Sequence, residues 1–129
     1  KPLAFGNIED CWVFGLPGNP VSTIVTCLLL VMPSLQVLCG TVPTPLLRIP
    51  ATLTSPVSHR PGRAEYQRGI YSQHARSGSG LRVKHTGDQG SNRLSTFAGA
   101  NCLIEIPKDS GDLDVGADVN ILLLSDLLT

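Results

Sequence analysis

The sequence has 129 residues, 10 basic and 10 acidic side chains and a formal net charge of zero, a size that suits one ordinary domain or two small ones. A neutral chain gives no general reason to expect nucleic-acid binding, so no nucleic acid is predicted among its partners. The four cysteines show neither a CxxC pair nor zinc-ligand spacing, which favours a reducing compartment and a cytoplasmic location.

The first residues predict two short strands. Residues 3–6 form one apolar segment, and residues 11–14 (CWVF) form a second segment with the composition of a buried strand. The polar residues 7–10 are expected to form the turn between them. The chain begins at Lys1 without an initiator Met, so we expect it to belong to a longer polypeptide.

A tight turn into a helix is predicted next, at residues 15–22 (GLPGNPVS). Asn19 is a preferred N-cap residue, and Pro20 suits the first helical position because the N–H that it lacks has no partner there. A helix N-terminus has unpaired backbone N–H groups and the positive end of the helix dipole, and glycine lets a ligand approach the backbone. These features indicate a site for a phosphate, a carboxylate or an oxyanion. The same residues also fit a strand–helix connection that binds nothing.

The helix itself is predicted over residues 20–39, ended by Gly40, with Ile24, Val25, Leu28 and Met32 on its buried face. A helix that is apolar on all sides is either buried or spans a membrane. Interspersed Ser and Thr residues, Pro33 and the lack of a basic flank argue against a membrane span. Pro33 is expected to bend the helix or to restart it.

The sequence pattern changes from helical to strand-like after the proline-containing linker at residues 41–45. Several short segments of strand composition follow, separated by turn residues, with a short helix expected at residues 92–98. This spacing predicts a small barrel or sandwich. The basic residues gather in residues 48–93, which predicts a region of positive potential toward an anionic ligand. His59, His74 and His85 lie in polar sequence and are expected at the surface.

Six motifs follow one another along the chain, namely KPxxFG at 1–6, GLPGNPVS at 15–22, PGR at 61–63, QRG at 67–69, TGxQxS at 86–91 and NCLI at 101–104. Motifs in this order resemble the C-terminal part of molybdopterin molybdenumtransferase, the family of bacterial MoeA and the gephyrin E domain. The resemblance covers the whole chain and implies the α+β class. Residues 1–43 would end an α/β molybdopterin-binding subdomain (strand, turn, long helix), and residues 44–129 would form a small all-β barrel-like C-terminal domain.

The resemblance implies a step in molybdenum cofactor biosynthesis. An enzyme of this family inserts molybdate into adenylylated molybdopterin and releases AMP in a magnesium-dependent reaction. The catalytic carboxylates and Mg²⁺ ligands of the family lie upstream of Lys1, so this chain is expected to be inactive alone and no metal ligand is assigned within it. The partners implied are the remainder of its own polypeptide, a second copy in a homodimer and a molybdopterin adenylyltransferase.

The same resemblance implies a set of substrate-binding residues. Arg68 and Ser91 match barrel positions proposed to help bind molybdate or a phosphate, and the planar fork of an arginine suits that task. Arg63 is a weaker candidate. The predicted substrate-binding residues are Lys1, Pro17, Gly18, Asn19, Pro20, Arg68 and Ser91.

Two other functions fit parts of the sequence. A gephyrin-like member would act as a scaffold that binds a receptor peptide. A generic phosphate-binding α/β protein with an appended barrel would use the strand–turn–helix alone.

Overall fold

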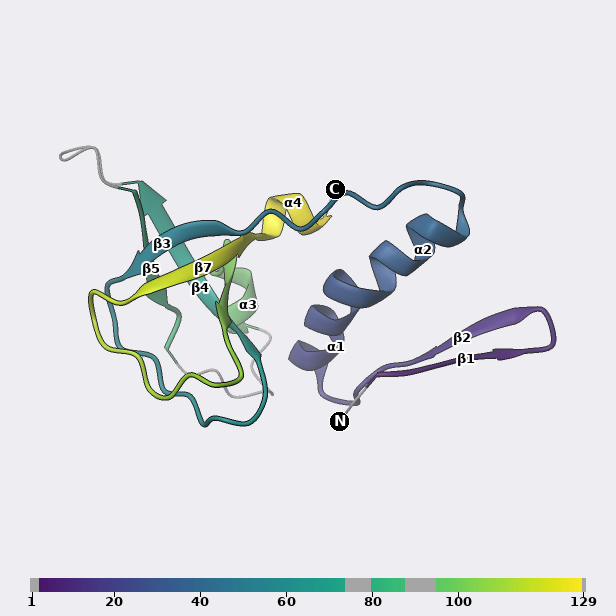
Figure 1. Ribbon diagram of the computed structural model, residues 1–129, viewed down its shortest axis with the longest axis horizontal. Helices are drawn as coiled ribbons and strands as arrows, with labels where there is room; N and C mark the ends of the chain where they lie inside the picture. Colours follow the sequence, from purple (N-terminus) through teal and green to yellow (C-terminus); the bar gives the residue numbers. More distant parts are fainter. Residues whose placement is uncertain (1–2, 74–79, 88–94, 129) are drawn as a thin grey trace. The chain divides into compact units, whose positions relative to one another are not determined.

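The computed structural model describes residues 3–73, 80–87 and 95–128, which fall into two compact units (Figure 1). Residues 3–45 form a hairpin–helix unit, and the remaining described residues form a barrel unit. Lys1, His74 and Ser91 lie outside the described residues. The assignment of residues 1–43 to the end of an α/β subdomain and of residues 44–129 to a separate domain stays a prediction.

The chain opens with an antiparallel hairpin, in which β1 (Ala4–Ile8) pairs with β2 (Cys11–Gly15). Phe5 stacks on Trp12 on one face, with ring centroids 5.2 Å apart and ring planes 4° from parallel. The strands agree with the sequence, but the expected burial of residues 11–14 is wrong, since Trp12 is 47 % exposed. A two-stranded ribbon offers two faces and has too little structure of its own to bury either of them.

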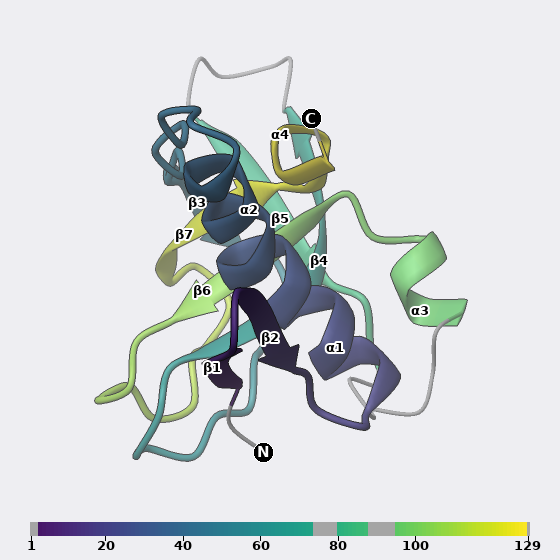
Figure 2. The ribbon, with the colours of Figure 1, turned by 90° about the vertical axis from the view of Figure 1, so that its right-hand side faces the viewer.

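The long helix comprises three segments, α1 (Pro20–Thr26), η1 (Cys27–Val31) and α2 (Met32–Leu38) (Figure 2). Its start and its end agree with the sequence, because Asn19 is the N-cap and Gly40 has a φ of 75° just past the end. The middle segment is a π-helix, and Pro33 stands in the first turn of α2. A proline ring clashes with the carbonyl four residues earlier, and the wider π turn leaves room there, so Pro33 restarts the helix as expected.

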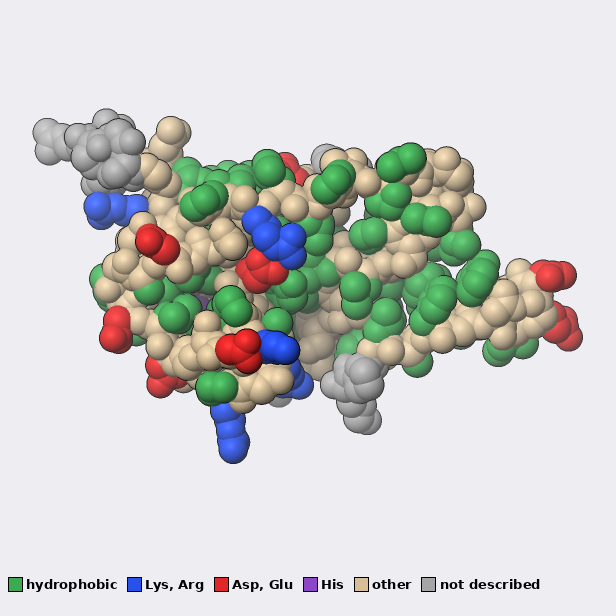
Figure 3. Space-filling view, viewed as in Figure 1, with side chains coloured by type: hydrophobic (Ala, Val, Ile, Leu, Met, Phe, Trp, Pro, Cys, Tyr) green, Lys and Arg blue, Asp and Glu red, His purple; other side chains and the backbone are tan. Residues whose placement is uncertain are grey.

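Few helix residues are buried. Val21, Leu28 and Val31 are, whereas Met32 is 39 % exposed, so its predicted place on the buried face is wrong. By length and composition alone the segment Pro20–Leu38 could cross a membrane, a test that the core helix of a soluble protein also passes. Figure 3 shows hydrophobic side chains over the surface of the helix and the hairpin. The large hydrophobic side chains exposed on the helix are Leu30, Met32, Leu35, Val37 and Leu38.

The second unit is a closed barrel, as the strand spacing predicts, with strand order β3-β5-β4-β6-β7. β3 is parallel to β5, and the other neighbouring pairs, including the closing pair of β3 with β7, are antiparallel. The expected short helix is present as α3 (Ser95–Ala98), whereas α4 (Leu124–Leu128) was not expected. The strands are β3 (Ile49–Leu53), β4 (Glu65–Gln73), β5 (Leu81–His85), β6 (Cys102–Ile106) and β7 (Asp118–Leu123).

The barrel interior is filled by alternate residues of each strand. Val83, Ile104 and Ile121 are fully buried members of this core. Gly69 on β4 faces the same interior, and a Cβ added there would stand 2.9 Å from side-chain carbons of both Ile104 and Val83. Real Cβ atoms do not approach so closely, so the glycine of the QRG motif is a packing requirement.

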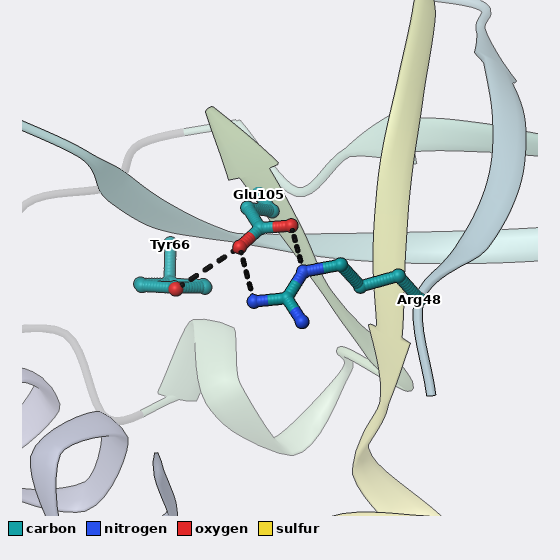
Figure 4. A network of polar contacts seen from close by, with 3 residues as sticks. All are labelled: Arg48, Tyr66 and Glu105. Carbon is teal, nitrogen blue, oxygen red and sulfur yellow. Dashed lines mark hydrogen bonds and ion pairs between the residues drawn. The ribbon is translucent and has the colours of Figure 1, made fainter. Parts of the chain in front are cut away.

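A polar cluster on the outer wall links three segments (Figure 4). Arg48 donates from Nε and Nη2 to the two carboxylate oxygens of Glu105, at 2.7 and 3.0 Å. Tyr66 donates its hydroxyl to Oε1 of Glu105, at 3.1 Å. The bond from Arg48 lowers the pKa of the Glu105 carboxyl, and burial is the main cause that raises the pKa of Tyr66. Because Arg48 directly precedes β3, this cluster fixes the entry of the chain into the barrel.

Replacing Gly69 by alanine should destabilise the barrel by about 1–3 kcal/mol, the usual cost of overpacking, because neither core neighbour can move away without displacing others. Gly111→Ala is the matched control, since a Cβ at Gly111 would meet nothing within 4 Å. Urea unfolding of the intact variants gives the two free energies. Equal stability of the two variants would show that the core at Gly69 is not tightly packed.

Removing the Glu105 carboxylate should lower stability at neutral pH and should matter less in acid. A carboxyl whose pKa is lowered by folding contributes stability that is fully present above its ordinary value of 4.5 and is lost as the pH falls through the folded value. The difference in melting temperature between wild type and Glu105→Gln should therefore shrink below about pH 4.5. Asp109→Asn, which changes an exposed carboxylate, is the control. A pH-independent difference for Glu105→Gln would contradict this account.

Candidate functional site

The predicted anion-binding turn, residues 17–20, is held mainly by the first turn of the helix. The Asn19 side chain accepts hydrogen bonds from the backbone N–H groups of Val21 and Ser22, at 3.1 and 3.2 Å. Thr23 donates its backbone N–H to the Asn19 carbonyl at 2.8 Å, and its hydroxyl lies within hydrogen-bond distance of the Asn19 and Pro17 carbonyls. Pro17 is buried and Gly18 is exposed.

This geometry corrects the expectation of unpaired N–H groups at the helix terminus. Pro20 has no N–H, and the next three N–H groups, at Val21, Ser22 and Thr23, already donate to Asn19. The turn therefore offers a ligand the helix dipole and the space beside Gly18, where an added Cβ would meet nothing within 4 Å. An anion would displace the Asn19 side chain if it took the N–H groups of Val21 and Ser22.

Arg68 lies on β4 in the barrel unit, on the outer face of the strand. It is paired in register with Leu103 of β6, and its side chain is only 1 % exposed. The strand alternation explains this placement, because Gly69 faces the interior and the residues before and after it face outward. A buried guanidinium carries a strong local field. An anion reaches it only if the groups that cover it move aside.

A chain of hydrogen bonds runs on the other face of the same strand. Gln67 is buried and donates its Nε2 hydrogens to the Ser58 carbonyl and to Glu65 Oε2, at 3.0 and 3.1 Å. Its Oε1 lies 2.8 Å from Nε2 of His85, the last residue of β5. The backbone N–H of Gly87 donates to Nδ1 of His85, at 3.2 Å.

The turn that follows β5 is tied to the Arg68 backbone. Thr86 donates both its N–H and its hydroxyl to the Arg68 carbonyl, each at 3.2 Å. Burial, followed by the charge of Arg68, lowers the pKa of His85. The QRG motif and the start of the TGxQxS motif therefore meet at one end of the barrel.

The expectation that the histidines lie at the surface is wrong for His59. His59 is 5 % exposed, and its Nδ1 and Nε2 lie 2.7 and 3.0 Å from the carbonyl oxygens of Ser110 and Arg63. His85 is half-buried. A signal for His85 was present in the sequence, since Leu81 and Val83 alternate with the exposed Arg82 and Lys84, and His85 continues the inward set.

The structure thus brings some predicted residues together. Pro17, Gly18, Asn19 and Pro20 form one turn in the hairpin–helix unit, whereas Arg68 lies in the barrel unit. Lys1 and Ser91 lie outside the described residues. Among the described residues, no group of three or more His, Cys, Asp or Glu side chains could hold a metal ion.

Comparison with known proteins gives a consistent result. The family model of the MoeA C-terminal region (domain IV) matches residues 50–124. The molybdopterin molybdenumtransferase of Haemophilus influenzae is 36 % identical over 99 % of this chain, and gephyrin of Dictyostelium discoideum is 33 % identical over 87 % of it. The crystal structure of the molybdopterin biosynthesis MoeA protein from Pyrococcus horikoshii is 27 % identical, with a TM-score of 0.68 over 92 % of this chain.

These matches cover only part of each relative. The chain spans 31 % of the Haemophilus protein, 16 % of the Dictyostelium protein and 29 % of the Pyrococcus chain. The family model covers more than half of this chain and most of the barrel unit, including strands β4 to β7 and all of β3 except its first residue. The chain therefore belongs to the MoeA/gephyrin family and carries its C-terminal region.

Proposed function

We propose that this chain supplies the C-terminal region of an enzyme of molybdenum cofactor biosynthesis, which inserts molybdate into adenylylated molybdopterin with release of AMP. The observation that carries the proposal is the 36 % identity to a molybdopterin molybdenumtransferase across nearly the whole chain. The scaffold function of gephyrin-like members rests on a lower identity over a smaller share of the chain.

The chemistry of the proposed substrates agrees with the charges in the barrel unit. Molybdate is a doubly charged oxyanion, and a guanidinium donates to such a group through paired N–H bonds. Arg68 is a cation already removed from water, so its attraction for an anion that reaches it is little screened. Ser91, which follows the Thr86–Gly87 turn by four residues, is proposed as a second ligand of the same anion.

Several further features of the whole protein are part of this proposal. The Mg²⁺ that the reaction uses would be held by residues outside this chain, and no step is assigned to a metal here. Lys1 and residues 17–20 would line the molybdopterin pocket at the end of an α/β subdomain. The protein would act in the cytoplasm as a homodimer, with a molybdopterin adenylyltransferase as supplier of its adenylylated substrate.

Variants of Arg68 in the intact protein test the anion site. Arg68→Ala should weaken the use of molybdate roughly ten- to a hundredfold, since a charge-assisted hydrogen bond contributes about 1.5–3 kcal/mol and about 1.4 kcal/mol is a factor of ten. Arg68→Lys should restore only part, because the fork of donors is lost. The measurement is molybdate-dependent cofactor formation at increasing molybdate concentrations.

Because Arg68 is buried, its removal should also lower the melting temperature, and the control must separate the two effects. Arg68→Met keeps most of the side-chain volume without the charge, and its melting temperature, measured alongside molybdate use, shows how much of the lost activity comes from lost stability. Weak molybdate use by a stable Arg68→Met protein would support the anion site. Wild-type molybdate dependence in that variant would remove Arg68 from the site.

The 129-residue chain alone should release no AMP from molybdopterin-adenylate, with or without Mg²⁺, because the catalytic carboxylates of the family lie outside it. The exposed side chains of the helix and hairpin should also bind a hydrophobic dye and promote aggregation. The intact protein is the positive control in both assays. Magnesium-dependent AMP release by the purified chain would contradict this prediction.

A further inference from the structure

His85 lies between two groups that together determine its protonation. Gln67 uses its amide nitrogen for the Ser58 carbonyl and for Glu65, so its amide oxygen is the atom that faces Nε2 of His85. An oxygen acceptor at 2.8 Å requires a hydrogen on Nε2. On the other side Gly87 donates to Nδ1, which must therefore carry a lone pair. Only the neutral ring with its hydrogen on Nε2 meets both demands.

The positive charge nearest the ring also favours its neutral form. Arg68, on the same strand as Gln67, opposes a second positive charge on His85. The Glu65 carboxylate is separated from the ring by Gln67, whose amide nitrogen donates to it. Ser55, on the loop after β3, contacts the His85 backbone through an uncharged hydroxyl, at 2.9 Å. Burial adds to the effect of Arg68, and both lower the pKa of His85.

We propose that His85 is a positioning residue, whose neutral ring, oriented by Gln67, binds the Gly87 N–H and so orders the Thr86–Gly87 turn, and that protonation of the ring loosens this turn. A hydrogen added to Nδ1 would point at the Gly87 N–H, which is also a donor. The two donors repel each other, and the bond from Gly87 is lost. Thr86 keeps its own bonds to the Arg68 carbonyl, so losing the Gly87 bond loosens the turn at its Gly87 end.

The consequence for the anion site rests on the proposed function. The turn is bonded to the Arg68 carbonyl through Thr86, so loosening the turn should weaken the binding of molybdate more than it slows the reaction of bound substrate. Because folding lowers the pKa of His85 below the ordinary value of 6.5, the ring is still mainly neutral at pH 6.5 and becomes protonated as the pH falls through the lower value. The apparent KM for molybdate should then rise on the acid side, with a smaller change in kcat.

The test begins with the protonation state of His85 in the intact protein, which needs no substrate. ¹⁵N-histidine labelling identifies the nitrogen that carries the hydrogen and gives the pH midpoint of the ring. Hydrogen exchange of the Thr86–Gly87 amides, corrected for the intrinsic rate, should lose protection below the same midpoint, by up to about tenfold per pH unit, the limit for one proton. A hydrogen on Nδ1 in the neutral ring, or protection that does not change with pH, would overturn the proposal.

Three variants separate positioning from a merely structural role. In Glu65→Gln/Gln67→Glu the net charge is kept and a carboxylate faces His85, so the midpoint should rise. His85→Leu should remove the pH dependence of exchange. Val83→Ala, which removes core methyl groups on the same face of β5, should lower the melting temperature and leave the midpoint unchanged. A midpoint that stays fixed in the exchanged pair would overturn the role of Gln67.

The molybdate assay then gives an independent reading. A KM that rises below the exchange midpoint in the wild type, and at a higher pH in Glu65→Gln/Gln67→Glu, supports the proposal. A KM that stays constant while the turn is released would overturn the link between His85 and the anion. A protein that forms no cofactor from molybdate at any pH would refute the proposed function instead, and the NMR and exchange results would still decide the role of the ring.

Discussion

Closing a sheet of five short strands leaves little room inside, and β4 is the strand on which this constraint acts most strongly. Gly69 lies so close to Ile104 and Val83 that no side chain fits there. The register around it is fixed as a result, since a slip by one residue would put Arg68 into the interior. The outward place of Arg68 and the inward place of Gln67 both depend on this contact. The QRG motif thus combines a core contact, a buried cation and a polar end to the barrel.

Local sequence patterns predicted much of the fold. The cap chemistry of Asn19 and Pro20 located the start of the helix, and Gly40 located its end. The strand spacing predicted the barrel, because alternation and turn residues are local signals. The parallel pairing of β3 with β5 has no such signal, since it joins segments that are distant in sequence. The helix α4 was missed because its apolar residues directly continue those of β7.

The candidate site was harder to predict, because its chemistry depends on which groups hydrogen-bond to each side chain or cover it in the folded chain. The N–H groups at the helix start looked available in the sequence, but the cap residue that marks the helix also occupies them. The burial of Arg68 could not be predicted, since burial on an outer face depends on what covers the strand. His85 followed a visible alternation, yet its tautomer depends on the orientation of the Gln67 amide, which no sequence pattern reports.

The π segment of the long helix also determines how this helix would respond to a change in its length. A π turn is equivalent to one extra residue inserted into an α-helix, and each residue turns the following side chains by about 100°. Side chains after Val31 therefore lie on a different face from the one they would occupy if the α-helix of the buried Val21 and Leu28 continued regularly. Deleting one residue from Cys27–Val31 would restore a regular α-helix and bring Leu35 and Leu38 around to a new face. The segment is thus a place where a single insertion or deletion changes the face that the end of the helix presents without unfolding it.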